Sequence, residues 1–255
     1  MSHLNAGRLN LSTLRDVARS ELFSILDTIE GDKSMVWDPK LVASFSLISD
    51  YSGLKEHKVV QMLELRGGPL PPSLTAQNLI YFVRPELAFI DIIAGMLIAL
   101  FVSFLSNFAW FFLGNIKAEE NGPRLQKIAL HLIFVPRKCV LCEQALQAAG
   151  VFGDFTTITD YSPDFYIFDS DIISIEWPLS YREYHLESAY SSLHQAAHAL
   201  MTFQCLFGVI PAVTGIGRSA KTVWDIMVRM RREMPAIIPQ VDHLILIDRS
   251  IDLLS

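Results

Sequence analysis

The sequence predicts an α/β protein with a parallel-sheet first domain flanked by helices, followed by the beginning of a second α/β domain. Short apolar segments alternate with helical stretches along the first 160 residues, an order typical of parallel βαβ units. Two segments, 79–83 (LIYFV) and 128–135 (IALHLIFV), are apolar throughout, as strands buried on both faces are. From about Trp177 the pattern changes to two helices and a strand, so we expect domains at 1–160 and 161–255.

The predicted elements of the first domain follow from periodicity and chain-breaking residues. Apolar residues between 11 and 29 recur at steps of three or four, which predicts an amphipathic helix that Asn10 or Ser12 caps and Gly31 ends. Asp38 and Pro39 form an N-cap and first-turn proline for the next helix. The remaining elements are expected to be strands at 35–37, 59–65, 79–83 and 128–135, a helix from Pro85 to 94, and a helix from Pro136 to Gly150.

The predicted elements of the second domain are fewer. Residues 166–168 and 243–247 are expected to form strands, and 188–207 and 218–234 to form helices. The chain ends at Ser255, soon after a buried-looking strand that has no expected neighbour, and strand edges need pairing or cover. We therefore expect the chain to be a fragment of a larger protein.

The 22 residues from 92 to 113 carry no charge, which is long enough for a helix to cross a bilayer. A single crossing would separate the strands at 79–83 and 128–135, which must share one sheet, and two crossings would need roughly 40 apolar residues. We expect an apolar helical excursion beside an intact sheet. A single-pass membrane anchor through 92–113 is the alternative.

Charge and cysteine content narrow the class of protein. The formal net charge is −6, and no block of basic residues stands out, which argues against nucleic acid as a partner. Three cysteines, Cys139, Cys142 and Cys205, suit a reducing compartment better than a disulfide framework. The polar first residues lack the apolar core of a secretion signal. The expected compartment is the cytoplasm.

A glycine-rich segment at 215–222 (GIGRSAKT) resembles two nucleotide-binding motifs. It approaches a P-loop, with Ala220 in place of the glycine before Lys221, and it also fits a loose G-x-G-x-x-A dinucleotide pattern. Both motifs need a strand immediately upstream, where the sequence predicts a helix and Pro211. We favour a glycine-rich helix start over phosphate binding and keep a nucleotide-binding enzyme as an alternative.

Other clusters of reactive side chains are incomplete. His194 and His198 lie one helical turn apart, but Gln195 replaces the glutamate of a zinc-protease helix. Cys139 and Cys142 form a single C-x-x-C, which could be a redox dithiol but lacks the second pair that structural zinc needs. We favour a partly exposed histidine pair on an otherwise packed helix, a buried Cys142 and an incidental Cys139.

Acidic residues near strand ends are the remaining candidates. Asp169, Asp171 and Glu176 could bind a cation but are more typical of a solvated turn, and Asp248, Arg249 and Asp252 could form a local ion-pair network. Nothing in the sequence pairs Asp248, Arg249 and Asp252 with a nucleophile or a base. The sequence therefore predicts no catalytic, cofactor-binding or metal-binding residues.

Six segments together resemble the amino-terminal part of the Sec/Munc (SM) family. They are 37–38 (WD), 54–57 (LKEH), 82–85 (FVRP), 134–137 (FVPR) with 141–143 (LCE), 168–174 (FDSDIIS) and 246–254 (LIDRSIDLL). The resemblance implies an arch-shaped, cytosolic, non-enzymatic protein that acts in vesicle docking and SNARE-mediated fusion. For the subtype it resembles, it implies endosome-to-lysosome or vacuole trafficking within a class C tethering complex (HOPS or CORVET).

The resemblance also sets the expected partners. SNARE proteins and class C tethering subunits are the implied partners, and attachment to late endosomes and lysosomes is implied to be peripheral. Family members run to about six hundred residues, so this chain would hold the first domain and the start of the second. Relatives lack an apolar stretch near 95–114, which resembles an insertion from a retained intron, an alternative exon or a lineage-specific addition.

Overall fold

The computed structural model describes residues 9–68, 76–112, 128–231 and 237–251, and the side chains of all of these except 103–112. The chain divides into two compact units. The sheet unit is Ser20–Ser162, and the helical unit combines Met1–Arg19 with Pro163–Ser255. The assignment of 1–160 and 161–255 to two domains of an SM protein stays a prediction.

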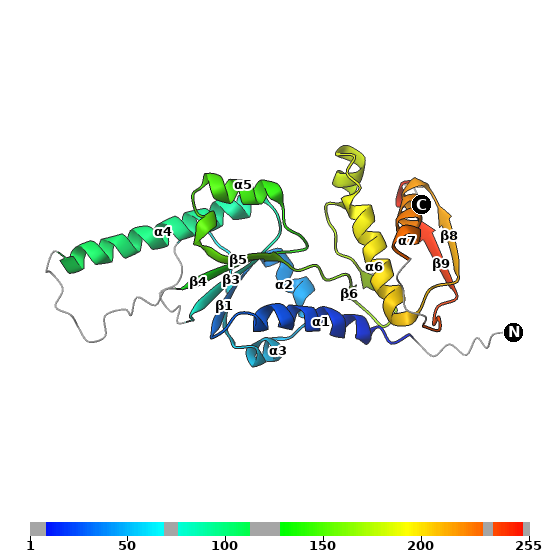
Figure 1. Cartoon of the computed structure of the whole chain (residues 1–255), viewed down its shortest axis with the longest axis horizontal. Helices are drawn as coiled ribbons and strands as arrows, with labels where there is room; N and C mark the ends of the chain where they lie inside the picture. Colours follow the sequence, from blue (N-terminus) through cyan, green and yellow to red (C-terminus); the bar gives the residue numbers. More distant parts are fainter. Residues whose placement is uncertain (1–8, 69–75, 113–127, 232–236, 252–255) are drawn as a thin grey trace. The chain divides into compact units, whose positions relative to one another are not determined.

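The sheet unit is built on a five-stranded, all-parallel sheet with the order β2-β1-β3-β4-β5, which confirms the predicted α/β class (Figure 1). The strands are β1 Lys33–Trp37, β2 Val59–Glu64, β3 Asn78–Val83, β4 Ala129–Phe134 and β5 Phe155–Asp160. β5 was not predicted, because its three threonines and its position at the sheet edge give it a weaker apolar signal.

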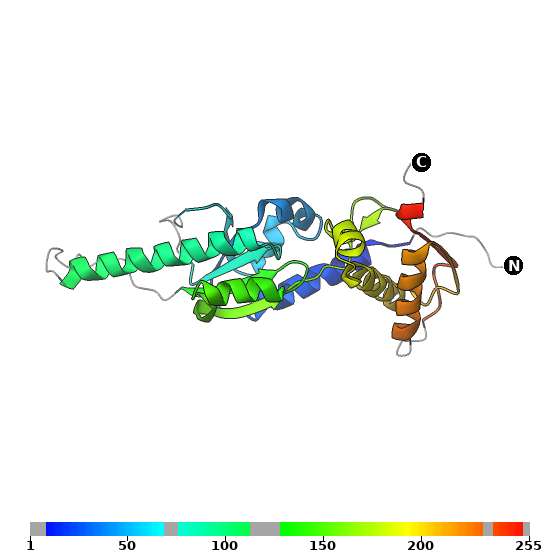
Figure 2. The same ribbon diagram turned by 90° about the horizontal axis from the view of Figure 1, so that it is seen from above.

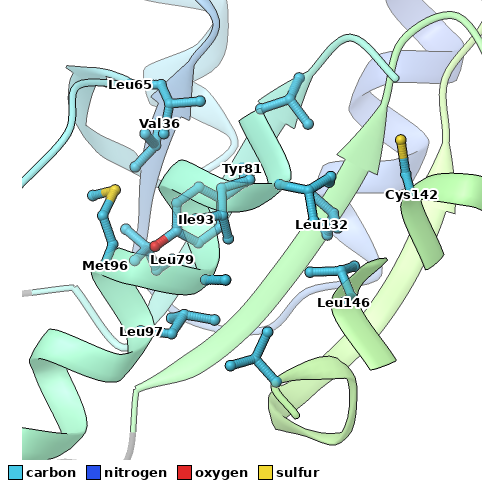
Figure 3. Packing of buried hydrophobic residues seen from close by; sticks show 14 of the residues in the cluster. Val36, Leu65, Leu79, Tyr81, Ile93, Met96, Leu97, Leu132, Cys142 and Leu146 are labelled. Carbon is cyan, nitrogen blue, oxygen red and sulfur yellow. The ribbon is translucent and has the colours of Figure 1, made fainter. Parts of the chain in front are cut away.

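Helices cover both faces of this sheet (Figure 1). They are α1 Ser12–Asp27, α2 Pro39–Ser46, α3 Tyr51–Glu56, α4 Leu87–Phe112, α5 Val140–Ala148 and the 3₁₀ turn η1 Phe152–Asp154. Alternate residues of each strand point to opposite faces, so Tyr81 and Leu132 pack against α4 and α5 while Phe82 packs against α2. Figure 3 shows Ile93 and Met96 of α4 beside Tyr81.

α4 is one continuous helix of 26 residues rather than a helix that ends at 94. Its buried residues, which include Ile93 and Leu97, pack on the sheet, whereas Ile98, Phe101 and Val102 are exposed. Both views show α4 continuing beyond the strands (Figure 2). The predicted helical excursion beside an intact sheet is therefore what the structure contains.

The described elements of the helical unit after Pro163 are β6 Tyr166–Ile167, β7 Ile173–Ser174, the π-helix η2 Arg182–Leu186, α6 Ser191–Phe207, β8 Ala212–Ile216, α7 Arg218–Met230, β9 His243–Ile247 and η4 Arg249–Ile251. Of these, β8, α7 and β9 form a βαβ unit, of which the sequence predicted the helix and the second strand but not β8. β8 pairs in parallel with β9, and α6, α7 and Leu244 and Leu246 of β9 share an apolar cluster. The prediction of no strand before Gly217 was wrong.

Candidate functional site

The carboxyl edge of the parallel sheet is where an α/β enzyme would bind its ligand. Strand order reverses between β1 and β3, because β1 connects to β2 on one side and β3 lies on the other. Ligands of doubly wound sheets occupy the crevice outside such a switch point. The residues that follow these two strands, Asp38 and Arg84, therefore decide whether a crevice exists.

An ion pair fills the switch point. Arg84 Nε lies 2.5 Å from Asp38 Oδ2, with side chains 14% and 0% exposed, and Arg84 also pairs with Glu86. Asp38 Oδ1 accepts a hydrogen bond of 3.0 Å from the backbone N–H of Lys40, as expected for the N-cap of α2. The guanidinium lies 5.1 Å from the Phe89 ring centre, over its face. Both charges are thus engaged within the fold.

Aromatic rings close the space beneath this ion pair. Trp37 stacks on Phe82 at 4.6 Å between ring centres, and Phe45 packs against Trp37, Phe82 and Tyr161. All four residues are buried. The described side chains at the switch point therefore pair with and pack against one another.

The glycine-rich segment 215–222 does follow a strand, contrary to the sequence-based expectation. β8 ends at Ile216, Gly217 adopts a φ of +105°, and α7 begins at Arg218. This strand–glycine–helix order is the arrangement that nucleotide-binding motifs require. The order alone, however, does not show what occupies the start of the helix.

A carboxylate of the same chain occupies it. Asp248, which follows β9, accepts a 2.9 Å hydrogen bond from the Ser219 N–H and further bonds from the N–H and hydroxyl of Ser250. Burial by itself would raise the pKa of Asp248, but these hydrogen bonds outweigh it and lower the pKa. A phosphate at this helix start would meet an ionised carboxylate. The structure does not favour the nucleotide-binding alternative.

Gly217 is required by this carboxylate. A Cβ at Gly217 would lie 2.4 Å from Asp248 Cβ, and its φ is one that side chains rarely tolerate. We expect Gly217→Ala to lower the free energy of unfolding of the helical unit by about 1–3 kcal/mol, measured by urea denaturation. Gly215→Ala is the matched control, because its Cβ would make only ordinary contacts at 3.6 Å or more. Equal losses in both variants would contradict this role.

The histidine candidates lie on the surface of α6. His194 and His198 are exposed, as expected. His198 Nδ1 lies 3.0 Å from Asp164 Oδ1, and Asp164 also accepts bonds from Gln195 and Thr202. Within the ranges described, no three His, Cys, Asp or Glu side chains converge in a way that could hold a metal ion. His198 thus fastens α6 to the segment that precedes it.

The cysteine pair has the expected environment. Cys142 is buried in the cluster between the sheet and α5, and Cys139 is the N-cap residue of that helix. Burial, with smaller contributions from Cys139 and Glu143, raises the pKa of Cys142 to about 12. The Cys142 thiol is therefore protonated at neutral pH and packs as a small apolar side chain of the cluster.

The acidic candidates lie in turns. Asp169 and Asp171 are exposed in the connection between β6 and β7, where the Asp169 side chain accepts a hydrogen bond from the Ser170 N–H. Glu176 is exposed and accepts a hydrogen bond from the Ser174 hydroxyl. Asp252 lies outside the described residues, so the ion-pair network with Asp248 and Arg249 stays a prediction.

The apolar run is the last candidate. β3 and β4, the strands before and after it, are hydrogen-bonded neighbours in one sheet. A single membrane crossing between them would put the two strands on opposite sides of a bilayer. Among the residues whose side chains the structure describes, which for α4 end at Val102, no helix has both the length and the apolar character that spanning a membrane requires. The membrane-anchor alternative through 92–113 is not favoured.

A polar row crosses the amino half of the sheet. His131 of β4 is buried, with Nδ1 2.5 Å from the Thr157 hydroxyl and Nε2 3.3 Å from Asn78 Oδ1. A neutral ring satisfies both contacts, one nitrogen donating and the other accepting. Burial first, and the positive charge of Lys33 second, lower the pKa of His131.

The lowered pKa predicts a loss of stability in mild acid. Below about pH 6.5 the unfolded chain binds a proton at His131 that the folded chain does not, so the free energy of unfolding falls as the pH falls. We expect His131→Gln, which keeps a donor and an acceptor, to give a flatter dependence between about pH 7 and 5. Urea denaturation at several pH values measures it; parallel curves for the two proteins would refute the assignment.

The first turn of α5 forms an exposed apolar and basic patch. Val140 and Leu141 are 67% and 63% exposed. Arg137 and Lys138, which lie just before the N-cap residue Cys139, are also exposed. We call these four residues the α5 patch. The α5 patch was not predicted from the sequence. A signal for it existed, because Cys142 and Leu146 already form the buried side of α5, and the adjacent residues Val140 and Leu141 cannot both face the sheet as well.

The geometry defines the class of protein: an α/β protein whose described switch-point side chains pair with one another, with exposed apolar residues on α4 and α5. The model of the Sec1 family matches residues 33–255. Vacuolar protein sorting-associated protein 33A of Rattus norvegicus is 40% identical over the whole chain. The vacuolar protein-sorting-associated protein 33 homologue of Arabidopsis thaliana is 32% identical over 97% of the chain. The chain belongs to the Sec1 family, as its resemblance to SM proteins predicted.

Solved structures agree on the fold. The SM protein Vps45 matches with a TM-score of 0.54 at 13% identity, and the Unc18–syntaxin 1 complex of Monosiga brevicollis with 0.55 at 16%. Each match covers 94% of this chain but only 42% and 40% of the other. The chain likewise spans 40% of the length of the rat relative, so it corresponds to a partial SM fold.

Proposed function

We propose that the chain serves SNARE-mediated membrane fusion in endosome-to-lysosome or vacuole trafficking, as a non-enzymatic binding protein. The observation that carries this proposal is the 40% identity, along the whole chain, to a relative named for vacuolar protein sorting. The closed switch point supports a role in binding rather than catalysis. On this proposal the full-length protein acts in the cytoplasm, peripherally on late endosome and lysosome membranes, as a subunit of a class C tethering complex (HOPS or CORVET).

Structural neighbours support SNARE proteins as the partner class. Unc18 is described in complex with syntaxin 1, Vps45 with the Qa SNARE Tlg2, and Sly1p with an N-terminal peptide of Sed5p. The α5 patch offers aliphatic side chains beside two cations, which suits a peptide that carries an apolar anchor and acidic groups. We assign SNARE-peptide binding to the α5 patch within this proposal.

The test introduces charge into the patch. We expect Val140→Asp with Leu141→Asp to weaken binding of a fluorescent Qa-SNARE N-terminal peptide at least about tenfold, measured by anisotropy. Gln147→Asp with Ala148→Asp is the matched control, because both residues are exposed in the last turn of α5, away from the patch. Loss of binding in both variants, or in neither, would remove the patch from the proposal.

Membership of a tethering complex needs a separate experiment. A tagged chain, extended to the length of its relatives, is expected to co-purify with class C subunits from cells. The α5-patch variant should retain these subunits, because the proposal assigns the patch to SNARE peptides alone. Absence of the subunits would refute the tethering role and leave the SNARE-binding test unaffected.

A further inference from the structure

The sheet unit contains a concave site at the amino ends of its strands, whereas the switch point lies at their carboxyl ends. A cavity of about 540 Å³ opens where β1, β2 and β3 begin, which is within the size range of small-ligand pockets. Its lining includes one buried lysine, Lys33, and an exposed rim of charged side chains. The described lining residues are Asp27, Ile29, Glu30, Gly31, Lys33, Glu56, His57, Lys58 and Gln77.

Lys33 forms the floor of the cavity. It is only 2% exposed, and its Nζ donates to the carbonyl oxygens of Gly31 at 3.2 Å and His57 at 3.0 Å. An ammonium has three hydrogens, and in the part of the chain that the structure describes no third acceptor lies within hydrogen-bond distance. A buried charged group with one donor left open favours an anionic acceptor.

Backbone carbonyls of His57 and Lys58 hold Lys33 in place. Lys58 adopts a φ of +63°, uncommon for a residue other than glycine, and its carbonyl accepts the Lys33 N–H at 2.9 Å. His57, the preceding residue, supplies one of the carbonyls that hold Nζ, and its ring is fixed by Asp27 at 2.7 Å and by stacking on Phe23. Unusual backbone conformations persist where the surroundings over-determine them, often at binding sites.

The rim of the cavity carries charged side chains of both signs. Glu30, Glu56 and Lys58 are exposed there, and among the described residues none of their charged groups has an ion-pair partner. With Lys33 and Asp27, the lining holds two lysines and three carboxylates, of which Asp27 already pairs with His57. A ligand with a single type of charge would be attracted by one part of this set and repelled by the other.

We propose that this cavity, the Lys33 site, binds a peptide segment of a partner protein that carries one carboxylate flanked by basic side chains. The carboxylate accepts the open hydrogen of the Lys33 ammonium at the floor. The neighbouring basic side chains pair with Glu30 and Glu56 at the rim. The carboxylate is expected to be that of an Asp or Glu side chain, because the ammonium lies below the surface and a side chain extends from the peptide backbone far enough to reach it.

The Lys33 site is independent of the α5 patch. The two lie in different parts of the sheet unit: the Lys33 site at the starts of the strands, the patch after the end of β4. Binding at one therefore does not depend on the proposal for the other.

The experiment uses two model peptides that differ in one group. The acetylated and amidated tripeptides Arg-Glu-Arg and Arg-Gln-Arg are titrated into the ¹⁵N-labelled chain, and chemical-shift changes of Gly31 and Lys58 report binding. We expect the glutamate peptide to bind about tenfold more tightly, the size of one charge-assisted hydrogen bond. Lys33→Met should abolish the difference.

A second variant keeps the test decisive if Lys33→Met does not fold. The double variant Glu30→Gln with Glu56→Gln alters exposed residues only and should weaken binding of the glutamate peptide several-fold. The control, Asp91→Asn with Asp154→Asn, removes two exposed carboxylates outside the cavity and should leave this binding unchanged. Equal affinity for the two peptides would overturn the proposal. So would tighter binding of inorganic phosphate or phosphocholine than of the glutamate peptide.

Discussion

Replacing Arg84 with Met is expected to lower the free energy of unfolding of the sheet unit by about 3–5 kcal/mol, as breaking a buried ion pair does. The Asp38 carboxylate is fully buried, and without the guanidinium it keeps only its hydrogen bond from the Lys40 N–H among the contacts described above. A charge in that position is poorly compensated. Urea denaturation followed by tryptophan fluorescence measures the change, because Trp37 lies in the aromatic cluster beside the pair.

The double variant Asp38→Asn with Arg84→Met is the control for this interpretation. Asparagine is also a good N-cap residue, and it removes the uncompensated charge while Met fills the space of the arginine stem. We expect the double variant to be more stable than Arg84→Met alone. A loss below about 1 kcal/mol in Arg84→Met would mean that the pair behaves as an exposed one.

Replacing Leu132 with Ala is expected to lower the free energy of unfolding of the sheet unit by about 2–5 kcal/mol. Leu132 is buried in the middle of β4 and packs in the cluster formed with α4 and α5 (Figure 3). The large effect depends on β4 pairing with β3 although the long apolar segment separates them in sequence.

Leu141→Ala is the matched control, since it makes the same chemical change at a residue that is 63% exposed. It should change the free energy of unfolding by about 0.5 kcal/mol or less. A similar small effect in both variants would show that Leu132 is not part of a packed sheet, and the intact α/β unit would have to be abandoned.

Much of the sheet unit is predictable because its signals are local. Buried parallel strands are apolar along their whole length, so 79–83 and 128–135 are recognisable without knowledge of their neighbours. Asp38 and Pro39 predict the start of α2 in the same way, through backbone geometry that involves adjacent residues only. β8 was missed because its residues, AVTGI, are mostly exposed, so an apolar pattern was never required of them.

The candidate sites depend on residues that are far apart in the sequence. Lys33 reads as an ordinary polar residue before a strand, and its site exists only because the turn at His57 and Lys58 folds around its ammonium. Asp248 fills the start of α7 from 29 residues away. No local pattern predicts that a glycine-rich helix start is already occupied by the chain's own carboxylate.

By itself the sequence determined the α/β class, the family, the positions of most helices and strands, and the impossibility of one membrane crossing between strands of one sheet. Those conclusions follow from hydrophobic periodicity, caps and local motifs, which short stretches of chain express. Only the tertiary structure decided that the switch point is closed, that the α7 start is occupied, and that a buried lysine has a hydrogen left to donate. Each of these is a matter of distances between groups that meet only when the sheet forms.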